Sequence, residues 1–174
     1  MSTNYSVMKD ADGRSIVVIN DIRFRGKRKI NWDEVEDYLK QYIGEFYEIA
    51  DTKDVVYVGK DFPDELTGSN DTARLQGTLA KAKANATQGL PQLIENAANK
   101  RFKENLASKH EADAKMGWYR YTTRFALPVY GEDDEIDRYN VFRIEVLIRQ
   151  EYDGKMYLYD LVNIKKETST PLEP

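Results

Sequence analysis

The sequence predicts an α+β fold, in which helices in the first part of the chain pack on a C-terminal antiparallel β-meander. Three observations predict it. A helical stripe of apolar residues follows Asn31, two segments after residue 117 alternate between apolar and polar positions, and Asp153-Gly154 marks a hairpin before a last strand. The 174 residues fit a single domain, expected over 15–170, after a flexible polar arm over 1–14.

The early elements follow from local patterns. Ser15 to Asn20 (SIVVIN) predicts a short buried strand, and Val55 to Val58 predicts a second one. Between them, Asn31 is a suitable N-cap, and an apolar stripe predicts one amphipathic helix over residues 32–49. The stripe has the 3.6-residue period and consists of Val35, Tyr38, Leu39, Tyr42, Ile43, Phe46 and Tyr47.

The middle of the chain predicts a polar loop over 59–71, a helix rich in alanine and lysine over 71–87, and a shorter helix from Pro91 to Asn99. Residues 100–117 fit either a helix or a loop. Three strands then complete the chain, over 118–130, 139–150 and 155–164.

Composition limits the chemistry. The chain has no cysteine, so disulfides, thiolate metal sites and cysteine nucleophiles are excluded. It has a single histidine, which excludes a histidine-cluster metal site and any mechanism that needs two. No phosphate-binding glycine loop or serine-hydrolase motif occurs, so we expect no metal and no cofactor. Without a secretory signal or a long apolar run, the chain is expected to be cytoplasmic and not to bind a membrane.

Charge is distributed unevenly around a net value of −4. Residues 31–70 contain eleven acids and three lysines, whereas residues 100–130 contain seven bases and three acids. A surface polarised in this way can hold a phosphate chain locally, although the whole protein is acidic.

Strand alternation predicts one polar sheet face in the last three strands. Tyr121 and Phe125 are expected inward in the first strand, and Phe142 and Ile144 in the second. In the last strand Met156, Leu158, Val162 and Ile164 are expected inward, together with Asp160, for which no partner is evident. The opposite face then gathers Trp118, Arg120, Thr122, Arg124, Arg143, Glu145, Arg149, Tyr157, Tyr159, Asn163 and Lys165.

This face has two interpretations. Arginine forks match phosphate oxygens, aromatic rings stack on bases, and a carboxylate among arginines stays ionised and can accept a proton. Equally, a solvated sheet face with arginine–glutamate pairs is ordinary surface chemistry. His110 likewise fits either a general acid near neutral pH or a solvated surface side chain.

Several segments carry a resemblance to a known family. GWYRYTTRFALPVY (117–130), RYNVFRIEVLIR (138–149) and DGKMYLYDLVNIKKETSTPL (153–172) resemble the large polyvalent protein-associated domains of phages and conjugative elements. So do residues 19–50 and ARLQGTLAKAKANA (73–86), which extends the resemblance over most of the chain. By architecture, the chain is also loosely similar to the phage branch of the barnase, EndoU, colicin and RelE-like nuclease superfamily.

The resemblance implies a barnase/RelE-like fold and metal-independent cleavage of RNA through a 2′,3′-cyclic phosphate. Glu145 would be the base, His110 the acid, and Arg120, Arg124 and Arg143 would hold the phosphate, with Lys165 and Thr168 orienting it. Trp118 and Tyr159 complete the expected substrate-binding set. The histidine precedes the sheet here, whereas it comes late in barnase.

Two alternatives to a ribonuclease remain open. The chain can be a non-catalytic module that binds a nucleic acid, or a host or phage protein, and blocks a host defence system. It can also be a structural domain of a larger polyvalent protein. The sequence does not indicate an oligomeric state.

Overall fold

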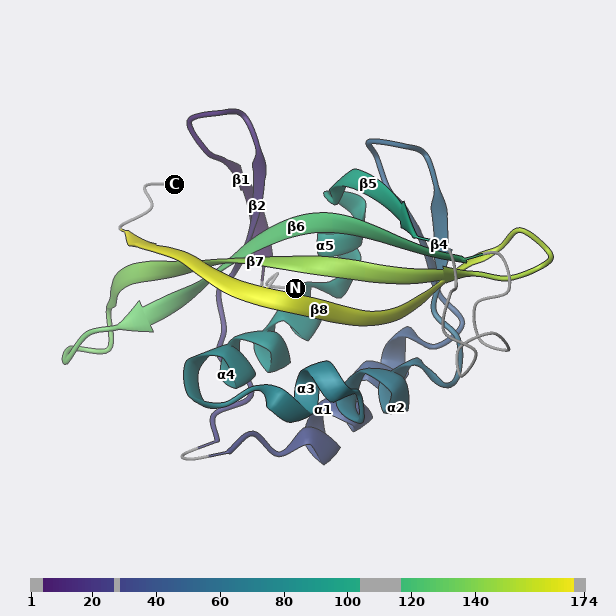
Figure 1. Ribbon diagram of the computed structural model, residues 1–174. Coiled ribbons are helices and arrows are strands. Elements are labelled where there is room, and N and C mark those ends of the chain that lie inside the picture. Colours follow the sequence, from purple (N-terminus) through teal and green to yellow (C-terminus); the bar gives the residue numbers. More distant parts are fainter. Residues whose placement is uncertain (1–4, 27–28, 104–116, 171–174) are drawn as a thin grey trace.

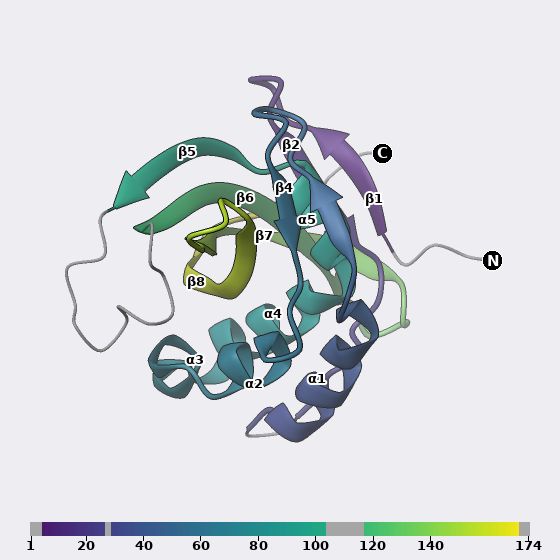
Figure 2. The ribbon, with the colours of Figure 1, turned by 90° about the vertical axis from the view of Figure 1, so that its right-hand side faces the viewer.

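The computed structural model describes residues 5–26, 29–103 and 117–170, and within these ranges the chain is an α+β fold (Figure 1). A curled mixed sheet is covered by short helices. In the view along the long strands, α1 to α4 gather on one side of the sheet (Figure 2). The helices are α1 (Trp32–Leu39), α2 (Phe62–Thr67), α3 (Asn70–Arg74), α4 (Gly77–Ala86) and α5 (Leu90–Glu95), with 3₁₀ turns at Lys40–Tyr42 and Thr87–Gly89.

The three long strands of the sheet are consecutive in the chain and form an antiparallel meander, as the sequence predicts. They are β6 (Gly117–Tyr130), β7 (Ile136–Gln150) and β8 (Met156–Thr170). Shorter strands extend the sheet in the order β1-β2-β6-β7-β8-β4-β3, and β5 also pairs with β6. They are β1 (Tyr5–Lys9), β2 (Ser15–Ile19), β3 (Phe46–Glu48), β4 (Val55–Tyr57) and β5 (Ala98–Lys103).

The sheet is therefore not only a C-terminal meander. β2 runs parallel to β6, and β4 runs parallel to β8, so strands from the N-terminal half flank the long strands on both sides. Residues 5–9, which the sequence assigns to a flexible arm, form β1 and pair with β2 in an antiparallel hairpin. Helices and strands alternate along the first hundred residues rather than separating into two blocks.

The prediction of one helix over 32–49 is wrong after the 3₁₀ turn that ends at Tyr42. Asn31 caps α1 as expected, with its side chain accepting from the Asp33 N–H, and the α-helix ends at Leu39. Gly44 then adopts a positive φ of 88°, which a residue with a side chain rarely takes. The chain turns there and enters β3, so that the end of the apolar stripe lies in a strand and Phe46 is exposed.

The segment 59–103 also differs from the prediction. The expected polar loop contains α2, whose Phe62 and Leu66 are fully buried. The helix predicted over 71–87 is split into α3 and α4, because Leu75 and Gln76 are extended between them. The helix predicted over 91–99 ends at Glu95, and residues 98–103 form β5.

One continuous core lies between the helices and the inward face of the sheet. The inward pleat of β6 and β7 contributes the side chains that the alternation predicts, including Tyr121, Phe125, Phe142 and Ile144. α5 packs on this face of β6, where Thr123 Oγ1 donates to the Leu93 carbonyl. The opposite pleat of the long strands carries polar side chains, except beside β2, where Ile16, Val18, Ala126 and Val141 form a second, smaller apolar cluster.

Asn85, fully buried in α4, fixes the chain that follows β2. Its Oδ1 accepts from the Phe24 N–H at 3.0 Å, and its Nδ2 donates to the Phe24 carbonyl at 3.0 Å. Buried backbone groups need such partners, because water cannot replace them.

We therefore predict that Asn85→Ala lowers the free energy of unfolding by about 2–4 kcal/mol, because it leaves both Phe24 backbone groups unsatisfied. Denaturant titration followed by circular dichroism measures the change. Lys81→Ala, an exposed substitution on the same helix, is the control and is expected to change stability by less than about 0.5 kcal/mol. Equal effects of the two substitutions would contradict the role given to Asn85.

Candidate functional site

The polar face is the side of β6, β7 and β8 that lies opposite α5. The register confirms the predicted pairing of β6 with β7, because Trp118 lies opposite Arg149, Thr122 opposite Glu145 and Arg124 opposite Arg143. In β8 the prediction is partly wrong. A bulge places Val162 opposite Glu145, and Leu161 takes the core position instead.

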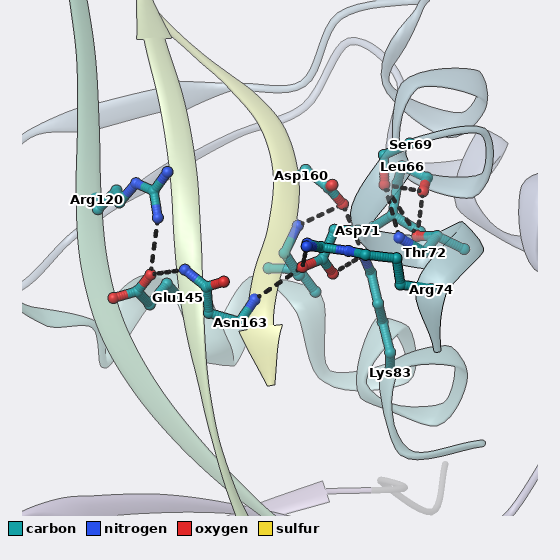
Figure 3. Close-up of polar contacts among 11 residues, drawn as sticks. Leu66, Ser69, Asp71, Thr72, Arg74, Lys83, Arg120, Glu145, Asp160 and Asn163 are labelled. Carbon is teal, nitrogen blue, oxygen red and sulfur yellow. Dashed lines mark hydrogen bonds and ion pairs between the residues drawn. The ribbon is translucent and has the colours of Figure 1, made fainter. Parts of the chain in front are cut away.

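Glu145 lies on this face and accepts three hydrogen bonds, of which Figure 3 draws those from Arg120 and Asn163. Arg120 Nη1 and Asn163 Nδ2 donate to its Oε1 at 3.1 Å and 2.6 Å, and Arg101 Nη2 donates to its Oε2 at 2.7 Å. Arg101 also donates to Thr122 Oγ1. The sequence misses Arg101, because β5 was not recognisable as a strand beside β6.

These partners set the protonation of Glu145. Burial raises the pKa of this carboxyl, but the hydrogen bonds from Asn163 and Arg120, and the positive charges of Arg101 and Arg120, outweigh burial and hold the pKa below its ordinary value. Glu145 is therefore ionised at neutral pH, and it is a weak proton acceptor while these contacts last.

Asn163 connects Glu145 to the helices beside β8. It has a positive φ of 55°, which asparagine tolerates better than most residues, and its N–H donates to Asp71 Oδ1 at 3.1 Å. Asp71 Oδ2 accepts from the fully buried Lys83 Nζ at 2.9 Å, and Lys83 also pairs with Asp160 Oδ1 at 3.1 Å. Figure 3 shows this chain of contacts running from the sheet face around β8 into α3 and α4.

Asp160 is buried, as expected, although the bulge pairs it with Leu147 rather than with a core position of β7. Lys83 is the partner that the sequence does not reveal. Burial raises the pKa of Asp160 to about 6, against the lowering effect of Lys83. A backbone N–H from Leu161 also donates to Asp160. The pair lies in the interior, where it supports the position of β8.

Arg143 and Lys165 lie opposite each other on β7 and β8, and both are exposed. In the described part of the chain, neither side chain has a hydrogen bond or an ion pair. Both line a pocket of about 360 Å³ that also contains Glu145, Asn163, Asp71 and Arg74. Two cations without a described partner therefore border a pocket that also contains the carboxylates of Glu145 and Asp71, both of which are already paired.

Arg124 does not join this group. Its guanidinium pairs with Asp10 at the tip of the β1–β2 hairpin, and its Nε donates to Glu167 Oε1 at 2.8 Å. Its side chain is 16% exposed. The expected role of Arg124 in holding a phosphate with Arg120 is not supported by this geometry, because Arg124 is satisfied by two carboxylates from elsewhere in the chain.

Two other predicted site residues lie at the opposite end of the long strands. Trp118 and Tyr159 meet over β7, with ring centroids 4.9 Å apart. They lie beside Arg149, which pairs with Glu65 at 2.5 Å. These aromatic residues are on the polar face, as predicted, but in a different part of it from Arg143.

His110 lies outside the described residues, and so does the side chain of Thr168, although its backbone belongs to β8. The described residues include no group of three or more side chains placed to hold a metal ion. None of the described helices has both the length and the apolar character needed to cross a membrane. No family model matches the chain, and neither a curated protein nor a solved structure resembles it at a significant level.

We predict that Glu145 stabilises the fold above its ordinary pKa and that this stabilisation is lost as pH falls. The lowered folded-state pKa means that the unfolded chain binds the proton more strongly, so acidification through about pH 4 favours unfolding. Glu145→Gln is expected to flatten this part of the stability profile, measured by denaturant titration between about pH 3 and 7. Glu132→Gln, in an exposed turn, should leave the profile unchanged. An equally steep profile in Glu145→Gln would disprove the prediction.

Proposed function

We propose that the polar face binds single-stranded RNA, with Arg143 and Lys165 holding a phosphate. The observation that carries this proposal is that these two exposed cations share a pocket and have no acidic partner in the described residues. Guanidinium and ammonium groups in this situation are available to phosphate oxygens. Arg101, Arg120, Arg124 and Arg149 are already paired with carboxylates.

Two further features favour RNA over a small phosphate. Aromatic side chains share the polar face with the cations, and bases stack on such rings. The segments of β6, β7 and β8 also resemble the large polyvalent protein-associated domains of phages, and the chain is by architecture loosely similar to the barnase, EndoU, colicin and RelE-like nuclease superfamily. Because the protein carries a net charge of −4, binding is expected to be local to this face rather than spread over the surface.

The expected result of the double substitution Arg143→Ala/Lys165→Ala is at least about a tenfold loss of RNA affinity. Each lost phosphate contact should also reduce the slope of log affinity against log salt by about 0.7. Fluorescence anisotropy with a labelled 2′-O-methyl RNA, which cannot undergo attack by its own 2′-hydroxyl, measures both. Arg138→Ala, on the same strand but paired with Asp137, is the control. Unchanged affinity and slope in the double variant would refute phosphate binding at this pocket.

Cleavage of the bound RNA is a second candidate, because Glu145 lines the same pocket as Arg143 and Lys165. In this reaction the 2′-hydroxyl proton passes to Glu145 while the 2′-oxygen bonds to phosphorus. The bond from phosphorus to the 5′-oxygen then breaks, leaving a 2′,3′-cyclic phosphate. The leaving 5′-oxygen takes up a proton, a role that the resemblance assigns to His110. The long C-terminal meander is compatible with the barnase/RelE-like arrangement in which this chemistry occurs.

Cleavage ranks second because both Glu145 oxygens are already engaged by Arg101, Arg120 and Asn163. These contacts hold the pKa of Glu145 low, which weakens it as a base. A bound phosphate that competes for the two arginines would loosen them and make Glu145 a better acceptor. Binding needs no such rearrangement.

If the chain is a ribonuclease, unmodified RNA is cut equally well with and without a chelator, and the products end in 2′,3′-cyclic phosphate. Glu145→Gln should then lower the cleavage rate by about a hundredfold or more while RNA affinity changes little. Gel electrophoresis with end-group analysis gives the rate and the product. A protein that binds RNA but never cuts it is instead a non-catalytic binding module.

A further inference from the structure

A row of side chains crosses the polar face at the end away from Arg143. Its members are direct partners in the strand register, so they project from the same face of six strands. In order from β5 to β3 they are Lys103, Trp118, Arg149, Tyr157, Tyr57 and Phe46. We call this set, with Tyr159 beside it, the aromatic row.

The rings and one guanidinium lie in contact along the row, with neighbouring rings tilted or edge-on to one another. The ring centroids of Phe46 and Tyr57 are 5.8 Å apart, and those of Tyr57 and Tyr157 are also 5.8 Å apart. The Arg149 guanidinium lies 6.0 Å from the Tyr157 ring and 5.8 Å from the Tyr159 ring. Trp118 then meets Tyr159, so the contacts extend from β3 to β6.

The row is accessible to a ligand. Phe46, a large apolar side chain, is 63% exposed. The side chains of Tyr57, Tyr157, Tyr159 and Trp118 are all partly exposed. An apolar ring exposed to water does not contribute the stabilisation that burial would give. On an edge strand, an exposed apolar ring also favours contact with another molecule.

Cations beside the aromatic row indicate the chemical class of ligand that can bind there. Lys155 Nζ lies 5.4 Å from the Tyr57 ring centroid, and Lys103 stands opposite Trp118. The Arg149 charge is balanced by Glu65 and Glu151, and its guanidinium lies near the Tyr157 and Tyr159 rings. Lys155 therefore lies over one face of Tyr57, and aromatic rings with lysines beside them suit the bases and phosphates of a single-stranded nucleic acid.

We infer that the aromatic row is a second subsite for the RNA of the proposed function, in which unpaired bases stack on Phe46, Tyr57 and Tyr157. The inference rests on that function. Arg143 and Arg149 are six residues apart on β7, which corresponds to about 20 Å along the strand. The row is therefore several nucleotides away from the phosphate at Arg143, and only a longer RNA reaches both.

The test compares the affinities of two 2′-O-methyl RNAs, one of about 3 and one of about 12 nucleotides, measured by fluorescence anisotropy. The longer RNA is expected to bind more tightly. Phe46→Ala and Tyr57→Ala should each weaken the longer RNA about tenfold and leave the shorter one unchanged. Tyr57→Phe keeps the ring and should retain wild-type affinity. Tyr152→Ala, an exposed aromatic residue outside the row, is the matched control.

The outcomes separate the two proposals. Loss of both RNAs in Arg143→Ala/Lys165→Ala, together with loss of only the longer RNA in Phe46→Ala, supports both subsites. Equal affinity of the two RNAs for the wild-type protein, or an unchanged longer-RNA affinity in Phe46→Ala, overturns the aromatic row and leaves the phosphate site standing. Absence of binding to either RNA overturns both. Because Phe46 is mostly exposed, its substitution tests the row without removing core packing.

Discussion

The placement of Lys83 between two carboxylates is the constraint on which the position of the candidate site depends. A fully buried ammonium group is tolerated only when it is paired and hydrogen-bonded, and Asp71 and Asp160 provide this pairing from α3 and β8. The pairing holds the helices against the edge of β8. Asp71 then fixes the backbone of Asn163 in its left-handed conformation, and the Asn163 side chain reaches Glu145. A core interaction thus determines the geometry of a surface carboxylate.

Charge pairing separates the cations of the polar face into two groups. Arg101 and Arg120 surround Glu145, Arg124 joins the β1–β2 hairpin to β8 through its two carboxylates, and Arg149 pairs with Glu65 of α2. These arginines hold parts of the fold together. Arg143 and Lys165 have no ion pair among the described residues, and both line one pocket. They are therefore the residues proposed to bind phosphate.

In the proposals, one sheet face supplies both kinds of contact that a flexible nucleic acid needs. The bulge in β8 places Lys165 beside Arg143, while the direct register across six strands aligns the aromatic row at the other end. Phosphate contacts supply salt-dependent affinity, and stacking on aromatic rings accepts any base. The net charge of −4 disfavours binding of RNA over the whole surface, so an acidic protein of this kind is expected to bind RNA on one face.

The sequence by itself determined the α+β class, the long strands of the meander and the face to which Trp118, Glu145 and Arg143 belong, because alternation and capping are local properties of the chain. It did not distinguish the helical stripe before Gly44 from the strand that follows, since both are apolar. Tertiary structure alone decided the partners: Lys83 for Asp160, Arg101 for Glu145, Asp10 for Arg124, and Phe46 beside Tyr57. Arg124 and Asp10 are 114 residues apart, and a pattern read over neighbouring residues contains no information about such a distance. Which charges remain available to a ligand follows from those long-range pairs, so the fold had to be known before the site could be placed.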